Sequence, residues 1–126
     1  MNVVVDTSKE RIELLKGVTD CILLSVIERK GPIYGYEIVR DVLRDSSGYF
    51  RLKEGTLYPV LKRLEKDELL TSRWENGRNR PRKYYSITPK GREALEEKHI
   101  QWQQFSTSVT LVYGSTSLWL EIAANV

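Results

Sequence analysis

The stretch from Lys53 to Lys66 places its apolar residues at the i, i+3, i+4 and i+7 spacing of one helix face: Leu57, Val60, Leu61 and Leu64. This spacing predicts a helix that buries one face and leaves the other free for polar contacts. Pro59 has no amide hydrogen and is comfortable only in the first turn of a helix, so we expect this helix to begin near residues 54–56. Glu54 or Thr56 is the expected cap.

Two short segments after this helix alternate polar with apolar or aromatic side chains, which is the pattern of half-buried strands. They span residues 70–75 and 82–87, and Asn76-Gly77 between them favours a turn. The loop is expected to continue through Arg78, Asn79, Arg80 and Pro81. The two segments therefore predict an antiparallel hairpin with a long basic tip.

The positive charge of the chain is concentrated in this region. Residues 51–83 hold ten Lys or Arg against five Asp or Glu, a local charge of +5, whereas the whole chain carries +3, so the remainder carries −2. A localised basic region is typical of a protein that binds a polyanion, most often nucleic acid. With 126 residues, 40% of them hydrophobic and 29% charged, the chain suits one small globular domain with a modest core.

Two further helices are expected before this region. Residues 8–29 carry apolar side chains on two sides, so one side needs a second packing partner, which can be another subunit. This helix should end at Lys30-Gly31-Pro32, with the glycine in the left-handed conformation. A shorter helix is expected from Tyr34 to about Arg44.

The last helix should run from Pro89 to about Tyr113, with Thr88 as its N-cap. It carries an apolar stripe spaced by 7, 3, 4 and 3 residues, which consists of Leu95, Trp102, Phe105, Val109 and Val112. Such a stripe packs along another helix. Because the earlier elements leave little apolar surface to cover it, we expect a homodimer whose interface also uses Ile12 and Leu15. The monomeric alternative folds the stripe back onto the first helix of the same chain.

The expected elements form a mainly α-helical α+β fold, in which a small antiparallel β-hairpin follows a helix-turn-helix. This is the layout of a winged helix-turn-helix with an added carboxyl-terminal helix. We expect the winged domain over residues 8–88, a dimerisation helix over residues 89–113 and a weakly patterned tail over residues 114–126.

The sequence does not predict an enzyme, because it shows no nucleophile with a base, no paired-carboxylate site and no phosphate-cradling loop. His99, the only histidine, has no second ligand at suitable spacing, so neither a metal site nor a cofactor is expected. Cys21 is the only cysteine, which excludes an intrachain disulfide, and it is expected to act as a small buried hydrophobe. In the absence of a signal peptide pattern or of about 18 consecutive apolar residues, we expect a cytoplasmic protein without a membrane partner.

Three segments of the chain carry the motifs of a known family. They are Gly35-Tyr36-Glu37-Ile38, residues 55–65 with Gly-Thr-Leu-Tyr-Pro at their start, and residues 81–91 with Arg-Lys-Tyr-Tyr at their centre. From about Leu14 to Trp102 the chain resembles the PadR family of bacterial transcriptional regulators. In the family, the helix that contains residues 55–65 is the recognition helix. The chain departs from the family at Glu68, where a glycine usually forms the turn after this helix.

The resemblance implies a repressor that binds an inverted repeat in DNA as a homodimer and is released by a ligand or by stress. It also implies that the long carboxyl-terminal helix packs against the partner's first helix. The chain is similar to the short subfamily, whose multidrug-binding members use a tryptophan on this helix to stack on flat aromatic compounds. Trp102 matches by position, so a small aromatic or hydrophobic effector is expected. The structural alternative places Trp102 in the dimer core.

Eight residues are expected to contact double-stranded DNA: Thr56, Tyr58, Lys62 and Arg63 from the recognition helix, and Arg78, Arg80, Arg82 and Lys83 from the hairpin. The first group should lie in or near the major groove and the second along the backbone or minor groove. Several alternatives stay open. The basic loop could be an ordinary solvated loop, or Arg82 and Lys83 could pair with Glu75. The domain could instead bind a protein, or respond to stress without a small molecule.

Overall fold

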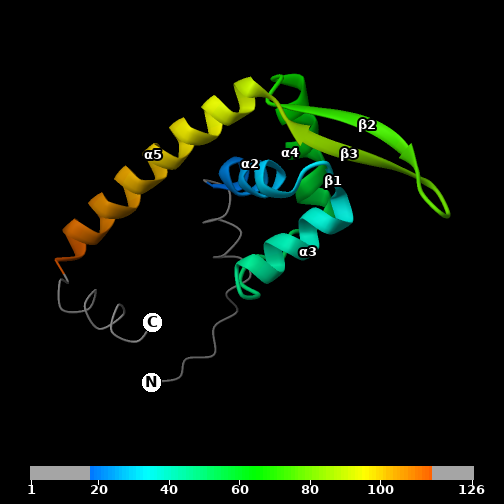
Figure 1. The fold of residues 1–126 in the computed structure, drawn as a ribbon. Coiled ribbons are helices and arrows are strands. Elements are labelled where there is room, and N and C mark those ends of the chain that lie inside the picture. The colour runs from blue at the N-terminus through cyan, green and yellow to red at the C-terminus, as the bar shows by residue number, and fades with distance from the viewer. Residues whose placement is uncertain (1–17, 115–126) are drawn as a thin grey trace. The chain divides into compact units, whose positions relative to one another are not determined.

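The computed structural model describes residues 18–114 of the chain (Figure 1). In chain order its elements are α2 (Thr19–Lys30), β1 (Ile33–Tyr34), α3 (Gly35–Asp45), α4 (Glu54–Lys66), β2 (Leu70–Asn76), β3 (Pro81–Ile87) and α5 (Pro89–Tyr113). They form two compact units, described over residues 18–95 and 96–114, and helix α5 contributes to both. The predicted α+β fold class is confirmed. The expected start of the first helix, at residue 8, lies outside the described residues.

The three strands form one antiparallel sheet with the order β1-β3-β2. The register of the hairpin pairs Leu70 with Ile87 and Asn76 with Pro81. Its loop is therefore residues 77–80, shorter than expected, because Pro81 already belongs to strand β3. Strand β1 was not predicted from the sequence, since two residues are too few to show an alternating pattern.

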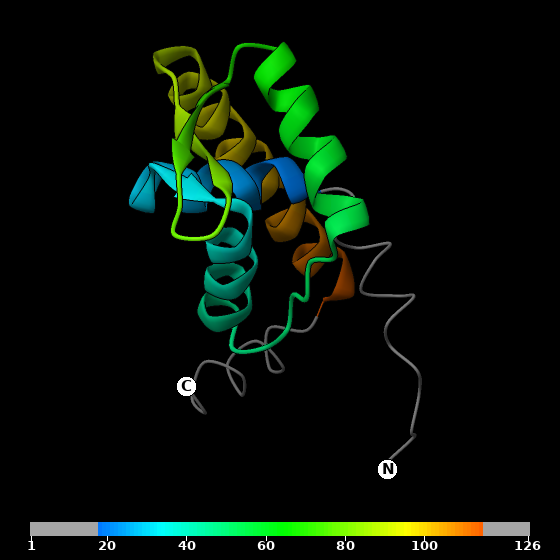
Figure 2. The ribbon, with the colours of Figure 1, turned by 90° about the vertical axis from the view of Figure 1, so that its right-hand side faces the viewer.

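The core of the first unit lies where helix α2 packs against α3, α4 and strand β3 (Figure 2). Leu57, Leu61 and Leu64 of α4 are buried, as their spacing predicts, whereas Val60 is half-buried. Cys21 is also half-buried and packs against the core. The other buried apolar side chains are Leu23, Leu24, Val26, Ile27, Ile33, Ile38, Val42, Leu52, Leu70, Tyr85 and Leu95.

The start of the recognition helix α4 differs in detail from the expectation. Its N-cap is Lys53, and the amides of Thr56 and Leu57 donate to the Lys53 carbonyl oxygen at 2.9 Å. The expected side-chain cap is therefore wrong, because Glu54 and Thr56 lie inside the first turn. The helix begins at Glu54, within the expected range, but Pro59 lies in its second turn and not in its first. There it leaves the carbonyl of Gly55 without its usual amide donor.

Gly31 ends helix α2 without the left-handed conformation expected of it. Its φ is −67° and its ψ is 151°, which is extended backbone, and its amide donates to the Ile27 carbonyl at 2.8 Å. A Cβ at this position would lie 2.6 Å from the Ile27 oxygen and 3.2 Å from the Tyr85 oxygen. Glycine is therefore required for the close approach of two backbone segments.

The turn after α4 holds a non-glycine residue in the left-handed region, because Glu68 has a φ of 63°. Its amide donates to the Glu65 carbonyl at 3.0 Å, and the amide of Leu69 donates to the Leu64 carbonyl at 2.9 Å. These two bonds are those of a Schellman helix end, where glycine is the usual left-handed residue. Glutamate thus takes up the conformation that glycine usually has at such a helix end, and both bonds of the turn form.

Helix α5 begins against this same turn. Thr88 caps it as predicted, since its Oγ1 accepts the Gly91 amide at 2.9 Å. The same hydroxyl lies 2.7 Å from the Glu68 carbonyl oxygen, to which it donates. Gly91 is buried, and a Cβ there would overlap the Leu69 carbonyl oxygen and lie 2.7 Å from Ile87 Cγ1. The first turn of α5 and the end of α4 are therefore in direct backbone contact.

A buried carboxylate joins α2 to α3. Asp41 is 2% exposed. Its Oδ1 is 2.9 Å from Arg44 Nη2 and 3.1 Å from Arg40 Nε, while its Oδ2 is 3.5 Å from Lys30 Nζ. Burial works against ionisation, but the hydrogen bond from Arg40 and the three positive charges outweigh it. The pKa of Asp41 consequently lies below its ordinary value of 3.8.

Candidate nucleic-acid interface

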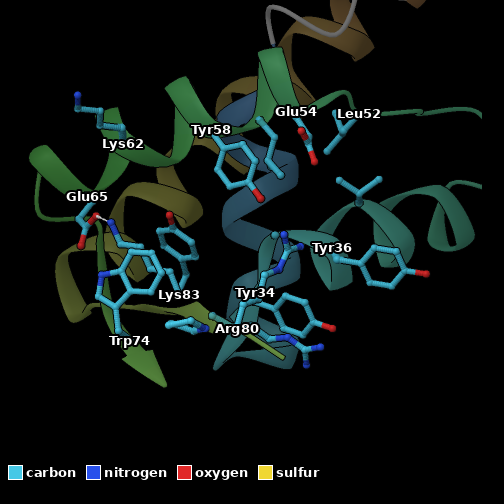
Figure 3. Close-up of a pocket in the computed structure, with 16 residues that line it drawn as sticks. Tyr34, Tyr36, Leu52, Glu54, Tyr58, Lys62, Glu65, Trp74, Arg80 and Lys83 are labelled. Carbon is cyan, nitrogen blue, oxygen red and sulfur yellow. Dashed lines mark ion pairs between the residues drawn. The ribbon is translucent and has the colours of Figure 1, made fainter. Parts of the chain in front are cut away.

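Helices α3 and α4 and the hairpin line a groove of about 1080 Å³ in the first unit (Figure 3). Its walls combine basic and aromatic side chains, and two acids also lie in it. The polar and aromatic lining residues are Tyr34, Tyr36, Glu54, Tyr58, Lys62, Glu65, Trp74, Arg80, Arg82, Lys83 and Tyr85. Five of these were predicted contacts for DNA: Tyr58, Lys62, Arg80, Arg82 and Lys83.

All four of the predicted recognition-helix residues are exposed: Thr56, Tyr58, Lys62 and Arg63. Tyr58 is 46% exposed and points from α4 across the groove toward the start of α3 (Figure 3). A Cβ on Gly35 would lie 2.5 Å from Tyr58 Oη, so the absence of a side chain at Gly35 makes room for this phenol. Two motif residues that are far apart in the sequence are thus packed together.

Arg63 is exposed, but its guanidinium is paired with an acid of the same chain. Its guanidinium binds the carboxylate of Asp20 on α2 with distances of 3.0 and 2.5 Å. The hydrogen bonds that Arg63 donates to Asp20 raise the pKa of Arg63 above its usual value. Arg63 therefore joins the recognition helix to α2, and its contact with DNA stays a prediction.

The tip of the hairpin presents two arginines. Arg78 and Arg80 are exposed, and the loop is closed by the Gly77 amide, which donates to the Arg80 carbonyl at 3.0 Å. Of these two, Arg80 lines the groove. Within residues 18–114, neither arginine forms an ion pair, and neither does Lys62. Their charges are therefore available to a polyanion.

The two basic residues that follow on strand β3 are engaged within the protein. The guanidinium of Arg82 lies 4.6 Å from the centre of the Tyr34 ring. Lys83 Nζ is 3.1 Å from Glu65 Oε1. The alternative partner, Glu75, is instead 2.7 Å from Arg73 Nε. An acid does neutralise Lys83, but it comes from the recognition helix.

Two exposed aromatic residues in the groove were not predicted as site residues. Tyr36 and Trp74 are each 67% exposed, on α3 and β2 respectively. Trp74 pairs with Lys83 across the hairpin. The alternation of strand β2 placed Trp74 on the inward face but did not show that recognition-helix residues would face it.

The predicted stripe of α5 is apolar and, beyond Leu95, exposed. The exposed fractions are 44% for Trp102, 62% for Phe105, 39% for Val109 and 87% for Val112. The rings of Trp102 and Phe105 stack with a centroid distance of 5.9 Å. Leu95 lies in the core of its own chain, where it is buried without a second copy. The other two predicted interface residues, Ile12 and Leu15, lie outside the described residues.

No cluster of three or more His, Cys, Asp or Glu in the described part of the chain could hold a metal ion. His99 is exposed on α5. Among the helices described, none has the length and apolar character required to span a membrane. The groove offers basic, phenolic and indole groups, which bind phosphates and nucleotide surfaces.

Helices α3 and α4 form a helix-turn-helix, and a two-stranded wing follows whose connecting loop carries basic residues. This arrangement defines the class of winged-helix DNA-binding proteins. Residues 23–97, more than half of the chain, match a family model described as "Transcriptional regulator PadR-like family". The chain therefore belongs to the PadR-like family of transcriptional regulators, which act by binding DNA and are not enzymes.

Solved structures of family members are similar over most of their length. A PadR family transcriptional regulator from Eggerthella lenta superposes with a TM-score of 0.75 at 34% identity, covering 87% of this chain and 94% of that one. A PadR-like transcriptional regulator from Bacillus cereus gives 0.68 at 34% identity, covering 80% and 96%. These similarities agree with the winged fold described above.

Sequence relatives agree with this membership. An uncharacterised protein from Lysinibacillus sphaericus is 34% identical over 105 residues, which are 80% of this chain and 93% of that protein. A transcriptional regulator from Mycobacterium tuberculosis is 42% identical over 60 residues, which are 48% of this chain and 56% of the relative.

Proposed function

We propose that this DNA-binding regulator is a repressor that binds an inverted-repeat operator as a homodimer and is released by a small aromatic or hydrophobic effector. The observation that supports the dimer is the exposed apolar stripe of α5 from Trp102 to Val112. A large apolar stripe on a helix marks an interaction surface, because its hydration is unfavourable. A second copy of α5, or the partner's first helix, would cover it.

The DNA-facing surface is the groove between α4 and the wing. Within it, we assign DNA contacts to the predicted residues whose polar groups are not held by an acid of the same chain: Thr56, Tyr58, Lys62, Arg78, Arg80 and Arg82. Arg63 and Lys83 are left out of this set because Asp20 and Glu65 bind them. In a two-fold dimer the recognition helices would enter successive major grooves about 34 Å apart. Contact with the chromosome would place the protein in the cytoplasm.

Arg80→Ala is expected to weaken binding to all DNA sequences to a similar extent and to lower the slope of log K against log salt by about 1. The reason is that an exposed wing arginine contacts phosphate, which is the same at every base pair. The measurement selects bound DNA from a random library with the full chain, then titrates the selected duplex and an unrelated one by fluorescence anisotropy at several salt concentrations.

Arg29→Ala is the matched control for Arg80→Ala. Arg29 is also an exposed arginine, but it pairs with Asp45 at 3.0 Å and does not line the groove, so the salt slope should stay at the wild-type value. Equal slopes for wild type and Arg80→Ala would remove the wing from the DNA contact. Selected sequences without two-fold symmetry would contradict the dimeric operator.

The effector proposal rests on Trp102, whose indole is partly exposed and stacked on Phe105. Flat aromatic dyes are expected to bind there and quench the tryptophan fluorescence. The measurement compares quenching of the wild type with that of Trp102→Leu, in which Trp74 still reports any binding elsewhere. If the dye quenches both proteins equally, Trp102 is a structural residue of the dimer and not a ligand platform.

A further inference from the structure

Both carboxylate oxygens of Glu65 are bound by the wing. The hydroxyl of Ser72 on β2 donates to Oε2, and Lys83 Nζ on β3 lies 3.1 Å from Oε1. Glu65 is a residue of the recognition helix α4. One side chain of that helix therefore contacts both strands of the wing. Figure 3 shows its ion pair with Lys83.

The hairpin register brings the two partners of Glu65 to the same face. Ser72 pairs with Tyr85, and Trp74 pairs with Lys83, so these four side chains share one face of the two strands. Lys83 Nζ is 5.6 Å from the Tyr85 ring centre and 6.0 Å from that of Trp74. The ammonium group is thus surrounded by a carboxylate and two aromatic rings, both of which favour a cation.

Lys83 is half-buried, whereas the two arginines at the wing tip are exposed. The side chain of Lys83 is 33% exposed and that of Glu65 is 30% exposed. If Lys83 moved to a DNA phosphate, it would leave the half-buried Glu65 carboxylate without its counter-ion and close to the phosphate. Arg80, at the exposed tip, leaves no acid behind when it contacts DNA.

We propose that Glu65 is a positioning residue that holds the wing against the recognition helix through Ser72 and Lys83, and that Lys83 acts within the protein and does not contact phosphate. The inference rests on the DNA-binding groove proposed above. Of the four wing residues predicted to contact DNA, it excludes Lys83 and keeps the two loop arginines and Arg82. It also gives the recognition helix a second task, which is to set the position of the wing tip.

The first test needs no DNA. The pKa of Glu65 lies below its ordinary value of 4.5, because the hydrogen bond from Ser72 and the contact with Lys83 outweigh the effect of burial. In a carbon-13 NMR titration of the folded protein, Ser72→Ala and Lys83→Gln should each move the Glu65 midpoint upward. Glu65→Gln identifies the signal by its loss. A midpoint that neither substitution moves would overturn the proposal.

The second test measures salt slopes on an arbitrary duplex. Lys83→Gln should retain the wild-type slope, whereas Arg80→Gln should lose about 0.9 of it, the value expected for one phosphate contact. Glu65→Gln releases Lys83 and should steepen the slope by up to about 0.9. This gain should vanish in the Glu65→Gln, Lys83→Gln double variant, because it acts through the lysine.

Glu75→Gln is the matched control for the change of charge. It also removes one wing-side carboxylate, but that carboxylate pairs with Arg73 on the same strand and does not reach the recognition helix. Its slope should stay closer to that of the wild type than to that of Glu65→Gln. If Lys83→Gln lost as much slope as Arg80→Gln, Lys83 would be a phosphate contact and the proposal would be wrong. Absence of DNA binding by the wild type would count against the proposed function, while the NMR titration would still decide the role of Glu65.

Discussion

Gly91→Ala is expected to destabilise the fold by about 3 kcal/mol or more. The added methyl group would overlap the Leu69 carbonyl oxygen, which belongs to backbone that is held by hydrogen bonds and cannot move aside like a flexible side chain. Either the first turn of α5 must shift or the turn after α4 must open. Urea unfolding followed by circular dichroism, at a fixed protein concentration, measures the change.

Gly55→Ala is the matched control for this substitution. Gly55 also lies in the first turn of a helix, but no atom is within 4 Å of a Cβ placed there. Because alanine favours the helix more than glycine does, the control should be neutral or stabilising by up to about 1 kcal/mol. Similar unfolding free energies for the wild type and Gly91→Ala would show that the contact between α5 and the turn is not tight.

Asp41→Ala is expected to lower the free energy of unfolding by about 2 to 3 kcal/mol. The substitution removes the buried carboxylate on which Lys30 of α2 and Arg40 and Arg44 of α3 converge. Asp45→Ala is the control, because Asp45 also pairs with Arg29 and Lys30 but its side chain is 35% exposed. Exposed pairs contribute little, so this variant should lose less than about 1 kcal/mol.

The contribution of Asp41 should also depend on pH. The pKa of this carboxylate is lower in the folded protein than its ordinary value of 3.8, so the folded state favours the ionised form. Its stabilisation is fully present above that ordinary value and is lost as the pH falls through the lower, folded-state pKa. Asp41→Ala should therefore show a smaller loss of stability on acidification than the wild type. If the free energy of unfolding fell equally for the two proteins on acidification, the proposed contribution of the buried Asp41 network would be wrong.

The recognition helix and the hairpin could be predicted because each has a strong local period. The apolar residues of α4 recur at helical spacing and three of them are buried, and the two strands alternate with a period of two. Thr88 is followed by a proline, which marks a helix start independently of the rest of the fold. Such patterns reflect the geometry of one element packing on one core, so they can be read from a single sequence.

The pairing of charged residues could not be predicted in the same way. Arg63 meets Asp20 across 43 positions, and Lys83 meets Glu65 across 18 positions, so each partner is fixed only when helices and strands pack. From the sequence alone, every basic residue in a basic segment is a candidate for a DNA contact, because its acidic partner in the fold is not known. Composition therefore indicated the region that we propose binds DNA, but it overestimated how many of the cations there are free of an acidic partner.

Glycine was correctly identified as a boundary residue, but its physical role was not always the expected one. Gly31 avoids a steric clash with Ile27 and Tyr85 and has ordinary extended angles. Conversely, Glu68 adopts the left-handed conformation for which glycine is the usual choice. Sequence alone shows where the chain turns, but the reason for a glycine depends on the backbone that passes beside it.

The hydroxyl of Thr88 binds the carbonyl of Glu68, in the turn that closes the recognition helix, while it caps α5. A displacement of the first turn of α5 must therefore break these bonds or carry the end of the recognition helix with it. Helix α5, which we propose as the dimerisation helix, and the recognition helix α4 are thus connected through a single turn of chain. A shift of the first turn of α5 would therefore be passed directly to the end of the recognition helix.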